Sequence, residues 1–317
     1  MAAGHPPRRP VTAAEANVRW SISRWGIMLR KSLDFVWRIL VCGFVFASGV
    51  VASRLALHAA NVSSPRMPNQ APESVAGWYL LAGSIVLAAG MSLSYINIRR
   101  SFPIRWFVLA AFLFTGFSVS TTIEAAIFSS TISVGQMIAV MFLPCILLTG
   151  VGTLLFKPRP PQSPPRQAVV DALRGLTWSQ WLLRLILGII AFPVTYFVFG
   201  IIVSPIVSPY YEQEIAGLVL PEPGVVLYTQ LLRGGIHLLA VMLLMIFWNG
   251  SRRQLILFLG LVFFIFVTAY DFVLAFQVPA VLVVIHGIEV LTSSFVYSWI
   301  LVSVLVRNRQ DIVGKAI

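Results

Sequence analysis

Long uninterrupted runs of apolar residues constrain this sequence more than any other feature. Eight runs have roughly the 20 residues that a helix needs to cross the hydrocarbon core of a bilayer. The chain is 58% hydrophobic and only 11% charged, whereas a soluble domain is roughly 25% charged. We therefore expect an all-α integral membrane protein, a polytopic bundle of about eight transmembrane helices. The predicted spans lie near residues 35–57, 78–97, 106–128, 135–156, 180–203, 226–248, 254–276 and 280–305.

The charged residues between these runs predict how the chain is threaded through the membrane. Lysine and arginine gather in alternate connections, whereas the other connections carry mainly glutamate. Because short loops rich in lysine and arginine stay on the cytoplasmic side, we expect both termini to be cytoplasmic and the protein to lie in the cell membrane. The net charge of +12 is spread over short clusters between apolar runs, so a nucleic acid is not an expected partner.

The connections also predict the domain organisation. Val18, Ile22, Trp25 and Leu29 recur at helical spacing in the basic N-terminal segment, and a helix of this kind suits an anionic inner leaflet. The segment either binds inner-leaflet lipids in this way or only orients the first span. The polar stretch 204–224 is expected to form an outer cap or re-entrant loop. The predicted order is a basic segment partly disordered or interfacial (1–34), a four-span half (35–156), a proline-rich linker (157–179), a second four-span half (180–305) and a cytoplasmic tail (306–317).

The two halves share residues at nearly constant spacing. Arg38 and Arg184 near the starts of the first and fifth spans are 146 positions apart, and Arg105 and Arg252 before the third and seventh spans are 147 apart. Both halves would enter from the inside, so this pattern predicts two parallel four-helix repeats about an axis along the membrane normal. The alternative is the general similarity of any apolar spans with basic ends.

Six ionisable residues lie inside the predicted spans, where each costs at least a few kcal/mol and suggests a functional site. The direction of the spans places all six in the outer half of the bilayer. Gln230, Arg233 and His237 follow the i, i+3, i+7 spacing of one helix face, and Gly234 and Gly235 are expected to permit close helix approach. The predicted polar pocket consists of Glu124, Arg233, His237, Asp271, His286 and Glu289.

Charge balance within this group suggests what it binds. Arg233 stays protonated and needs one carboxylate, so two of the three carboxylates remain in excess when the histidines are neutral. Excess buried carboxylates take up protons, bind a cation or face water. His237, His286 and Glu289 are also candidate zinc ligands, although no HExxH motif is present. The alternative is a purely structural ion pair that locks the helices together.

These features favour a transporter-like or proton- or cation-coupled membrane protein. One alternative is a membrane-embedded hydrolase or transferase that uses a histidine as general base. Arg233-Gly-Gly-Ile-His237 and His286-Gly-Ile-Glu289 loosely resemble motifs of the CAAX-processing intramembrane proteases, but the paired glutamates of that family are missing because Glu124 stands alone. The other alternative is a sensor or assembly subunit. No Walker, dinucleotide or haem motif occurs, and the sequence assigns no cofactor or protein partner.

Overall fold

The structure is a computed structural model of the chain, and its description covers seven stretches of residues. Within them, the side chains of residues 13–27, 73–74 and 269–274 lie outside the description. The described residues are 90% helical and include no strand. The stretches are 13–60, 62, 73–128, 133–158, 176–214, 219–274 and 279–306.

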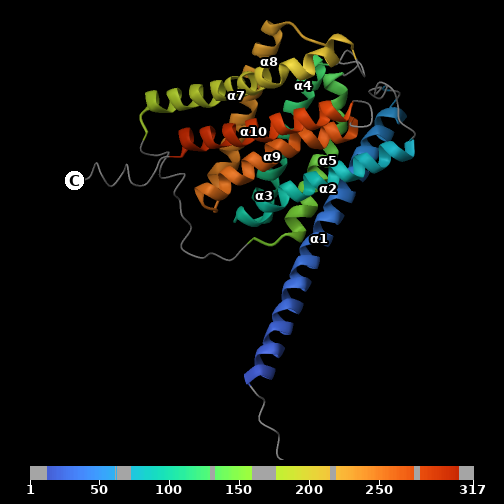
Figure 1. Cartoon of the computed structure of the whole chain (residues 1–317), viewed down its shortest axis with the longest axis vertical. Helices are drawn as coiled ribbons and strands as arrows, with labels where there is room; N and C mark the ends of the chain where they lie inside the picture. The colour runs from blue at the N-terminus through green and yellow to red at the C-terminus, as the bar shows by residue number, and fades with distance from the viewer. Residues whose placement is uncertain are drawn as a thin grey trace, which may run out of the picture.

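Helices follow one another along the chain and pack into a bundle (Figure 1). The third, fourth and fifth elements form one uninterrupted rod, because the π-helix η1 joins α3 directly to α4. In chain order the described elements are α1 (Ala13–Ala59), α2 (Glu73–Asn97), α3 (Phe102–Leu113), η1 (Phe114–Val119), α4 (Ser120–Phe128), α5 (Val134–Leu155), α7 (Trp178–Glu212), α8 (Pro223–Phe247), α9 (Arg252–Leu274) and α10 (Ala280–Leu305).

Seven helical segments within the described residues are long and apolar enough to cross a membrane. They comprise Met28–Ala59 of α1, Val75–Asn97 of α2, the rod Phe102–Phe128, and the whole of α5, α7, α8 and α10. The predicted eighth span, 254–276, coincides with α9, which is 23 residues long but whose described side chains end at Thr268. The prediction of a polytopic helical membrane protein is confirmed at this level.

Two predicted boundaries differ from the structure. The helix predicted over 15–33 is continuous with the first span, because α1 runs unbroken from Ala13 to Ala59 and projects beyond the bundle (Figure 1). The loop predicted at 204–224 is wrong over its first part, because Ser204–Glu212 continues α7 through Pro205 and Pro209. Each proline removes only one N–H donor, and helix is the best way to satisfy the remaining backbone near a membrane. Residues 1–12, 159–175 and 307–317 of the predicted termini and linker lie outside the described residues.

The same pairs of helices pack in each half of the chain. In the first half α1 contacts α2 and α5, and α3 contacts α5. In the second half α7 contacts α8 and α10, and α9 contacts α10. Across the two halves α2 contacts α9, and α8 contacts α3, η1 and α4. The contacts of α1 with α2 and α5 thus resemble those of α7 with α8 and α10, and α2 and α8 are both 25 residues long.

In each half, an arginine of the first helix donates a hydrogen bond to the last turn of the fourth helix. Arg38 Nη1 on α1 donates to the carbonyl of Leu155 at 2.7 Å, and Arg184 Nη1 on α7 donates to the carbonyl of Leu305 at 3.4 Å. These carbonyls belong to the final turns of α5 and α10, where intrahelical partners are lacking. The third helices repeat the match: Arg105 donates to the carbonyl of Thr153, and Arg252 Nη2 donates to Ser303 Oγ at 2.8 Å.

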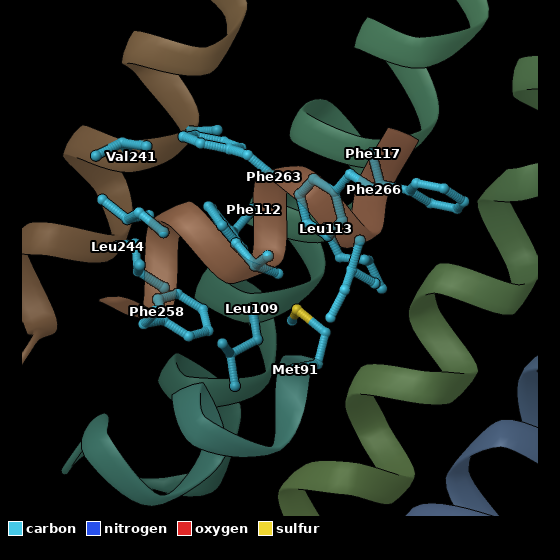
Figure 2. Close-up of a cluster of buried hydrophobic side chains, with 14 of the residues drawn as sticks. Met91, Leu109, Phe112, Leu113, Phe117, Val241, Leu244, Phe258, Phe263 and Phe266 are labelled. Atoms are coloured by element: carbon cyan, nitrogen blue, oxygen red, sulfur yellow. The ribbon is translucent and has the colours of Figure 1, made fainter. Parts of the chain in front are cut away.

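An apolar core joins the two halves. Figure 2 shows Phe112 and Phe117 of the first half beside Phe258, Phe263 and Phe266 of α9. Phe112 and Phe117 each lie 5.6 Å from Phe266 between ring centroids. These rings are buried. The contact between the halves at this point therefore depends on dispersion and on the shapes of the apolar side chains. The polar groups of the site lie outside this contact.

Candidate functional site

The structure gathers five of the six predicted residues around one small cavity, which is lined by residues of both halves. The cavity has a volume of about 50 Å³ and is surrounded by the rod α3–η1–α4 and by α7, α8, α9 and α10. Among its lining residues are Glu124, Arg233, His237, His286 and Glu289. The sixth residue, Asp271, lies in the last turn of α9, and its side chain lies outside the described residues.

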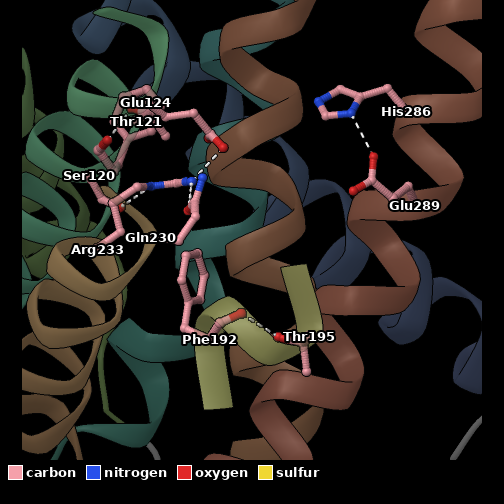
Figure 3. Close-up of polar contacts among 10 residues, drawn as sticks. Ser120, Thr121, Glu124, Phe192, Thr195, Gln230, Arg233, His286 and Glu289 are labelled. Carbon is pink, nitrogen blue, oxygen red and sulfur yellow. Dashed lines mark hydrogen bonds and ion pairs between the residues drawn. The ribbon is translucent and has the colours of Figure 1, made fainter. Parts of the chain in front are cut away.

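Arg233 is the most heavily bonded member of the group. Its guanidinium is 2% exposed, and Nη1 lies 2.5 Å from Glu124 Oε1. The same Nη1 donates to Gln230 Oε1 at 2.8 Å, and Nε donates to Ser120 Oγ at 3.1 Å. The guanidinium also lies over the ring of Phe192, 5.1 Å from its centroid. Figure 3 shows this group converging on the guanidinium. Arg233 is therefore a paired, hydrogen-bonded cation and not a free one.

The crossing of α7 and α8 holds Arg233 in this position. A Cβ atom added to Gly234 would lie 2.4 Å from the carbonyl oxygen of Ile189, so only glycine lets the two helices approach this closely. A Cβ atom added to Gly235 would meet nothing within 4 Å. The prediction that both glycines permit helix approach is thus correct for Gly234 and wrong for Gly235, which faces away from α7.

His237 lies in an aromatic enclosure one turn along α8. Its ring centroid is 4.7 Å from that of Phe192, 4.8 Å from that of Phe263 and 6.3 Å from that of Tyr297. The imidazole lies near the backbone of Gly116 in η1, where the irregular π-turn offers carbonyls outside the α-helical pattern. His237 Nδ1 and the Tyr297 hydroxyl are buried and have no hydrogen-bond partner in the protein. Both side chains line the cavity, so its surface includes unsatisfied polar atoms.

The second charged pair lies on α10. His286 Nδ1 is 3.0 Å from Glu289 Oε2, one helical turn away. The side chain of His286 is 36% exposed and that of Glu289 is 9% exposed, so the histidine lies nearer the surface of the bundle than the carboxylate. Figure 3 shows this pair and the Arg233 group as two separate clusters, with no bond drawn between them. A neutral imidazole beside a carboxylate carries one negative charge, so one additional proton on His286 or Glu289 makes the pair neutral.

This pairing changes the expected metal chemistry. No group of three His, Cys, Asp or Glu side chains in the described part of the chain could hold a metal ion. His237 is enclosed by aromatic rings and Glu289 is engaged by His286, so zinc binding by His237, His286 and Glu289 stays a prediction. The carboxylate and hydroxyl oxygens that line the cavity are better suited to bind a proton, water or a small cation than to bind zinc.

Several cavity residues had not been predicted. Ser120 lies one turn before Glu124 on the same face, which is a signal that helical spacing alone could have provided. Phe192, Thr195 and Tyr196 line the cavity from α7. Nothing in the sequence distinguishes these α7 residues from ordinary packing residues, because their role depends on how α7 crosses α8 and α10.

The first half has no such cavity lining at the corresponding positions. The ends of α2 and α8 differ by 150 positions, as do the ends of α5 and α10, so residues of these two helix pairs are compared at that spacing. Counting back from Arg233 and His237 gives Gly83 and Leu87, and counting back from His286 and Glu289 gives Gln136 and Ala139. Gly49 packs there directly against Pro144. The same helix arrangement is thus held in the first half without the ion pair or the histidines.

No family model, no curated protein and no solved structure matches this chain. Its function must therefore be argued from the site itself, and not from fold-level analogy.

Proposed function

We propose that this chain is a transporter-like membrane protein that binds a proton or a small cation at the His286–Glu289 pair and couples that binding to its activity. The observation that carries the proposal is the size of the charged cavity. A volume of about 50 Å³ accommodates roughly three or four waters, at 10–15 Å³ each. Pockets for organic ligands measure roughly 300–1,000 Å³. The cavity thus suits an ion with a few waters.

The comparison between the halves supports a functional role over a structural one. If Arg233, His237, His286 and Glu289 served only to lock helices together, the first half would need similar residues for the same packing. It has Gly83, Leu87, Gln136 and Ala139 instead. Buried charges are costly, and they persist here on one side of a repeated arrangement.

The positions of His286 and Glu289 suggest the order in which the two side chains take up a proton. Glu289 lies deeper than His286, so a proton entering from solvent meets the imidazole first and can pass to the carboxylate 3.0 Å away. Waters in the cavity would give the buried Tyr297 hydroxyl and His237 Nδ1 the partners that the protein does not supply. The Arg233–Glu124 pair contributes no net charge to the cavity.

We further propose that the halves arose by duplication as parallel repeats, with both termini cytoplasmic in the cell membrane. The matched arginine contacts and helix neighbours support the duplication, and the basic connections support the orientation. In this orientation the cavity lies in the outer half of the bilayer, and only the second half acquired the arginine and the two histidines, whereas Glu124 belongs to the first half.

The test is ion flux in proteoliposomes that contain the purified full-length chain and a trapped proton- or sodium-sensitive dye. Under an imposed membrane potential we expect the wild-type protein to move one of these ions. Glu289→Gln should reduce that flux by about tenfold or more, since the amide cannot take up the charge-balancing proton or pair with a cation. The control is Thr292→Ala, an exposed α10 residue whose hydroxyl bonds only Ile288. Wild-type flux in Glu289→Gln, or no flux of either ion through the wild type, would contradict the proposal.

A membrane-embedded hydrolase is the second candidate, and one observation favours it. Glu289 bonds His286 through Nδ1, as in enzymes whose general-base histidine is oriented by a carboxylate. Turnover of a lipid-ester or peptide substrate in the same proteoliposomes without ion flux, lost in His286→Ala, would support this candidate over the first.

Thiol labelling tests the orientation of the site. The native Cys42 and Cys145 are fully buried, so introduced cysteines can be read against a low background. We expect His286→Cys to react with a membrane-impermeant maleimide added outside intact cells, and the exposed Arg100→Cys to react only after the membrane is opened. The reversed pattern would overturn the proposed orientation. Labelling of neither cysteine from outside would show that the cavity does not open outward.

A further inference from the structure

Two loops meet at the end of the bundle opposite the cavity. The loop 97–101 joins α2 to α3, and the loop 247–251 joins α8 to α9. An antiparallel bridge pairs Ile98 with Trp248, and the backbone N–H of Asn249 donates to the carbonyl of Asn97 at 3.0 Å. Helices α3 and α9 begin directly after these loops, so their N-termini are brought to the same place. We call this surface the loop-pair site, and define it by Arg99, Arg100, Trp248, Arg252 and Arg253.

The loop-pair site carries positive charge and few acceptors. Its four arginines come from the two paired loops and the first turn of α9. The nearest acidic side chain at this end within the described residues is Asp34, and Arg38 already contacts it at 2.5 Å. The other described acidic side chains of the chain are Glu124, Glu212, Glu214, Glu222 and Glu289, which lie in the cavity or at the opposite helix ends.

A buried polar atom here is an unsatisfied donor. Trp248 Nε1 has no hydrogen-bond partner in the protein, although this side chain is only 5% exposed. Trp248 Nε1 faces its own loop, since a Cβ atom added to Gly250 would lie 2.7 Å from it. Ser101 makes no side-chain cap at the start of α3, whereas Ser251 and Gln254 cap α9 reciprocally. The missing partner must therefore be an acceptor, and an anion best fits the charge.

Apolar residues beside the arginines indicate that this anion belongs to a lipid. Phe102, Ile104 and Leu257 are exposed large hydrophobic side chains in the first turns of α3 and α9. Arg100 lies over the ring of Phe247, 5.5 Å from its centroid, which keeps its guanidinium close to the helix ends. A phosphate on the arginines would thus have room for its acyl chains along α3 and α9, at the headgroup level where these helices begin.

We propose that the loop-pair site binds the phosphate of an anionic lipid headgroup. Arginine forks hold phosphate oxygens in two parallel hydrogen bonds, and the uncapped N-terminus of α3 supplies further N–H donors. This site is distinct from the basic N-terminal segment for which inner-leaflet lipid binding is expected from sequence, and it does not depend on the proposed ion-binding role of the cavity.

Binding of a short-chain phosphatidylglycerol to the purified full-length chain in neutral detergent tests the proposal. We expect Arg100→Gln/Arg253→Gln, which changes two exposed side chains, to weaken binding by roughly tenfold or more, at about 1 kcal/mol for each arginine near a headgroup. The matched control Lys157→Gln/Arg159→Gln removes the same charge from the linker after α5 and should bind as the wild type does. Equal weakening in both variants would indicate diffuse attraction and would overturn a defined site, as would unchanged binding in Arg100→Gln/Arg253→Gln.

Inorganic phosphate and a zwitterionic lipid distinguish the source of the phosphate. We expect short-chain phosphatidylglycerol to bind at least tenfold more tightly than either inorganic phosphate or short-chain phosphatidylcholine. If inorganic phosphate binds as tightly as the anionic lipid, the site takes a free phosphate and the lipid assignment is wrong. If phosphatidylcholine binds equally well, the acyl chains alone account for binding and the arginines do not recognise the headgroup.

Discussion

Replacing Arg233 with methionine is expected to lower the free energy of unfolding by about 3 kcal/mol, because breaking a buried ion pair leaves the other charge unpaired. Glu124 would lose the cation 2.5 Å away, and Gln230 and Ser120 would lose their shared donor. Methionine preserves much of the packing volume of the arginine stem. Unfolding in detergent, followed by denaturant or thermal melting of helical circular dichroism, measures the change.

A second substitution separates lost charge balance from lost packing. Adding Glu124→Gln to Arg233→Met removes the stranded carboxylate, and a buried pair replaced as a whole often costs little. We therefore expect the double variant to regain most of the lost stability. If Glu124→Gln/Arg233→Met is as unstable as Arg233→Met alone, the guanidinium stabilises the fold through its contacts with Phe192 and Ser120, and the ion pair is not the cause.

The neighbouring glycines of α8 should respond oppositely to the same substitution. Gly234→Ala places a methyl group 2.4 Å from the carbonyl oxygen of Ile189. Because that atom is backbone, α7 must move away, which we expect to cost about 2 kcal/mol or more. Gly235→Ala meets open space and should be neutral or stabilising by up to about 1 kcal/mol, since alanine favours helix.

Melting temperatures of the two glycine variants, measured in the same detergent, test whether the two substitutions differ in their effect on stability. Gly234→Ala should also disturb the adjacent Arg233 and the cavity, so any loss of stability should be accompanied by loss of ion flux. Equal melting temperatures for Gly234→Ala and Gly235→Ala would contradict the close crossing of α7 and α8 at Ile189.

The sequence was sufficient to predict a polytopic helical membrane protein and to select five residues that line one cavity, because both depend on simple physical constraints. An apolar run of the right length has few alternatives to a membrane helix, and the direction of each span fixes the depth of its polar residues. That is why Glu124, which lies far from Arg233 in sequence, could be assigned to the same cavity as His286 and Glu289 before any contacts were known.

What the sequence could not specify depends on helix rotation and on crossing points. It offered three carboxylates for Arg233 without a reason to prefer Glu124, and it treated Gly234 and Gly235 alike although only Gly234 contacts α7. The π-turn that brings Gly116 to His237 leaves no recognisable pattern among apolar residues. The helix through Pro205 was missed because proline signals a break more strongly in a soluble context than near a membrane.

We infer that the His286–Glu289 pair at the cavity serves function and is not required for folding. The most direct test gives α10 the residues found at the corresponding positions of α5, as His286→Gln/Glu289→Ala, and measures stability and ion flux on one preparation. Because α5 packs in an equivalent way with Gln136 and Ala139, we predict an unfolding free energy within about 1 kcal/mol of the wild type together with flux reduced to that of empty liposomes. Retained flux in a stable variant, or a variant that fails to fold, would contradict the account.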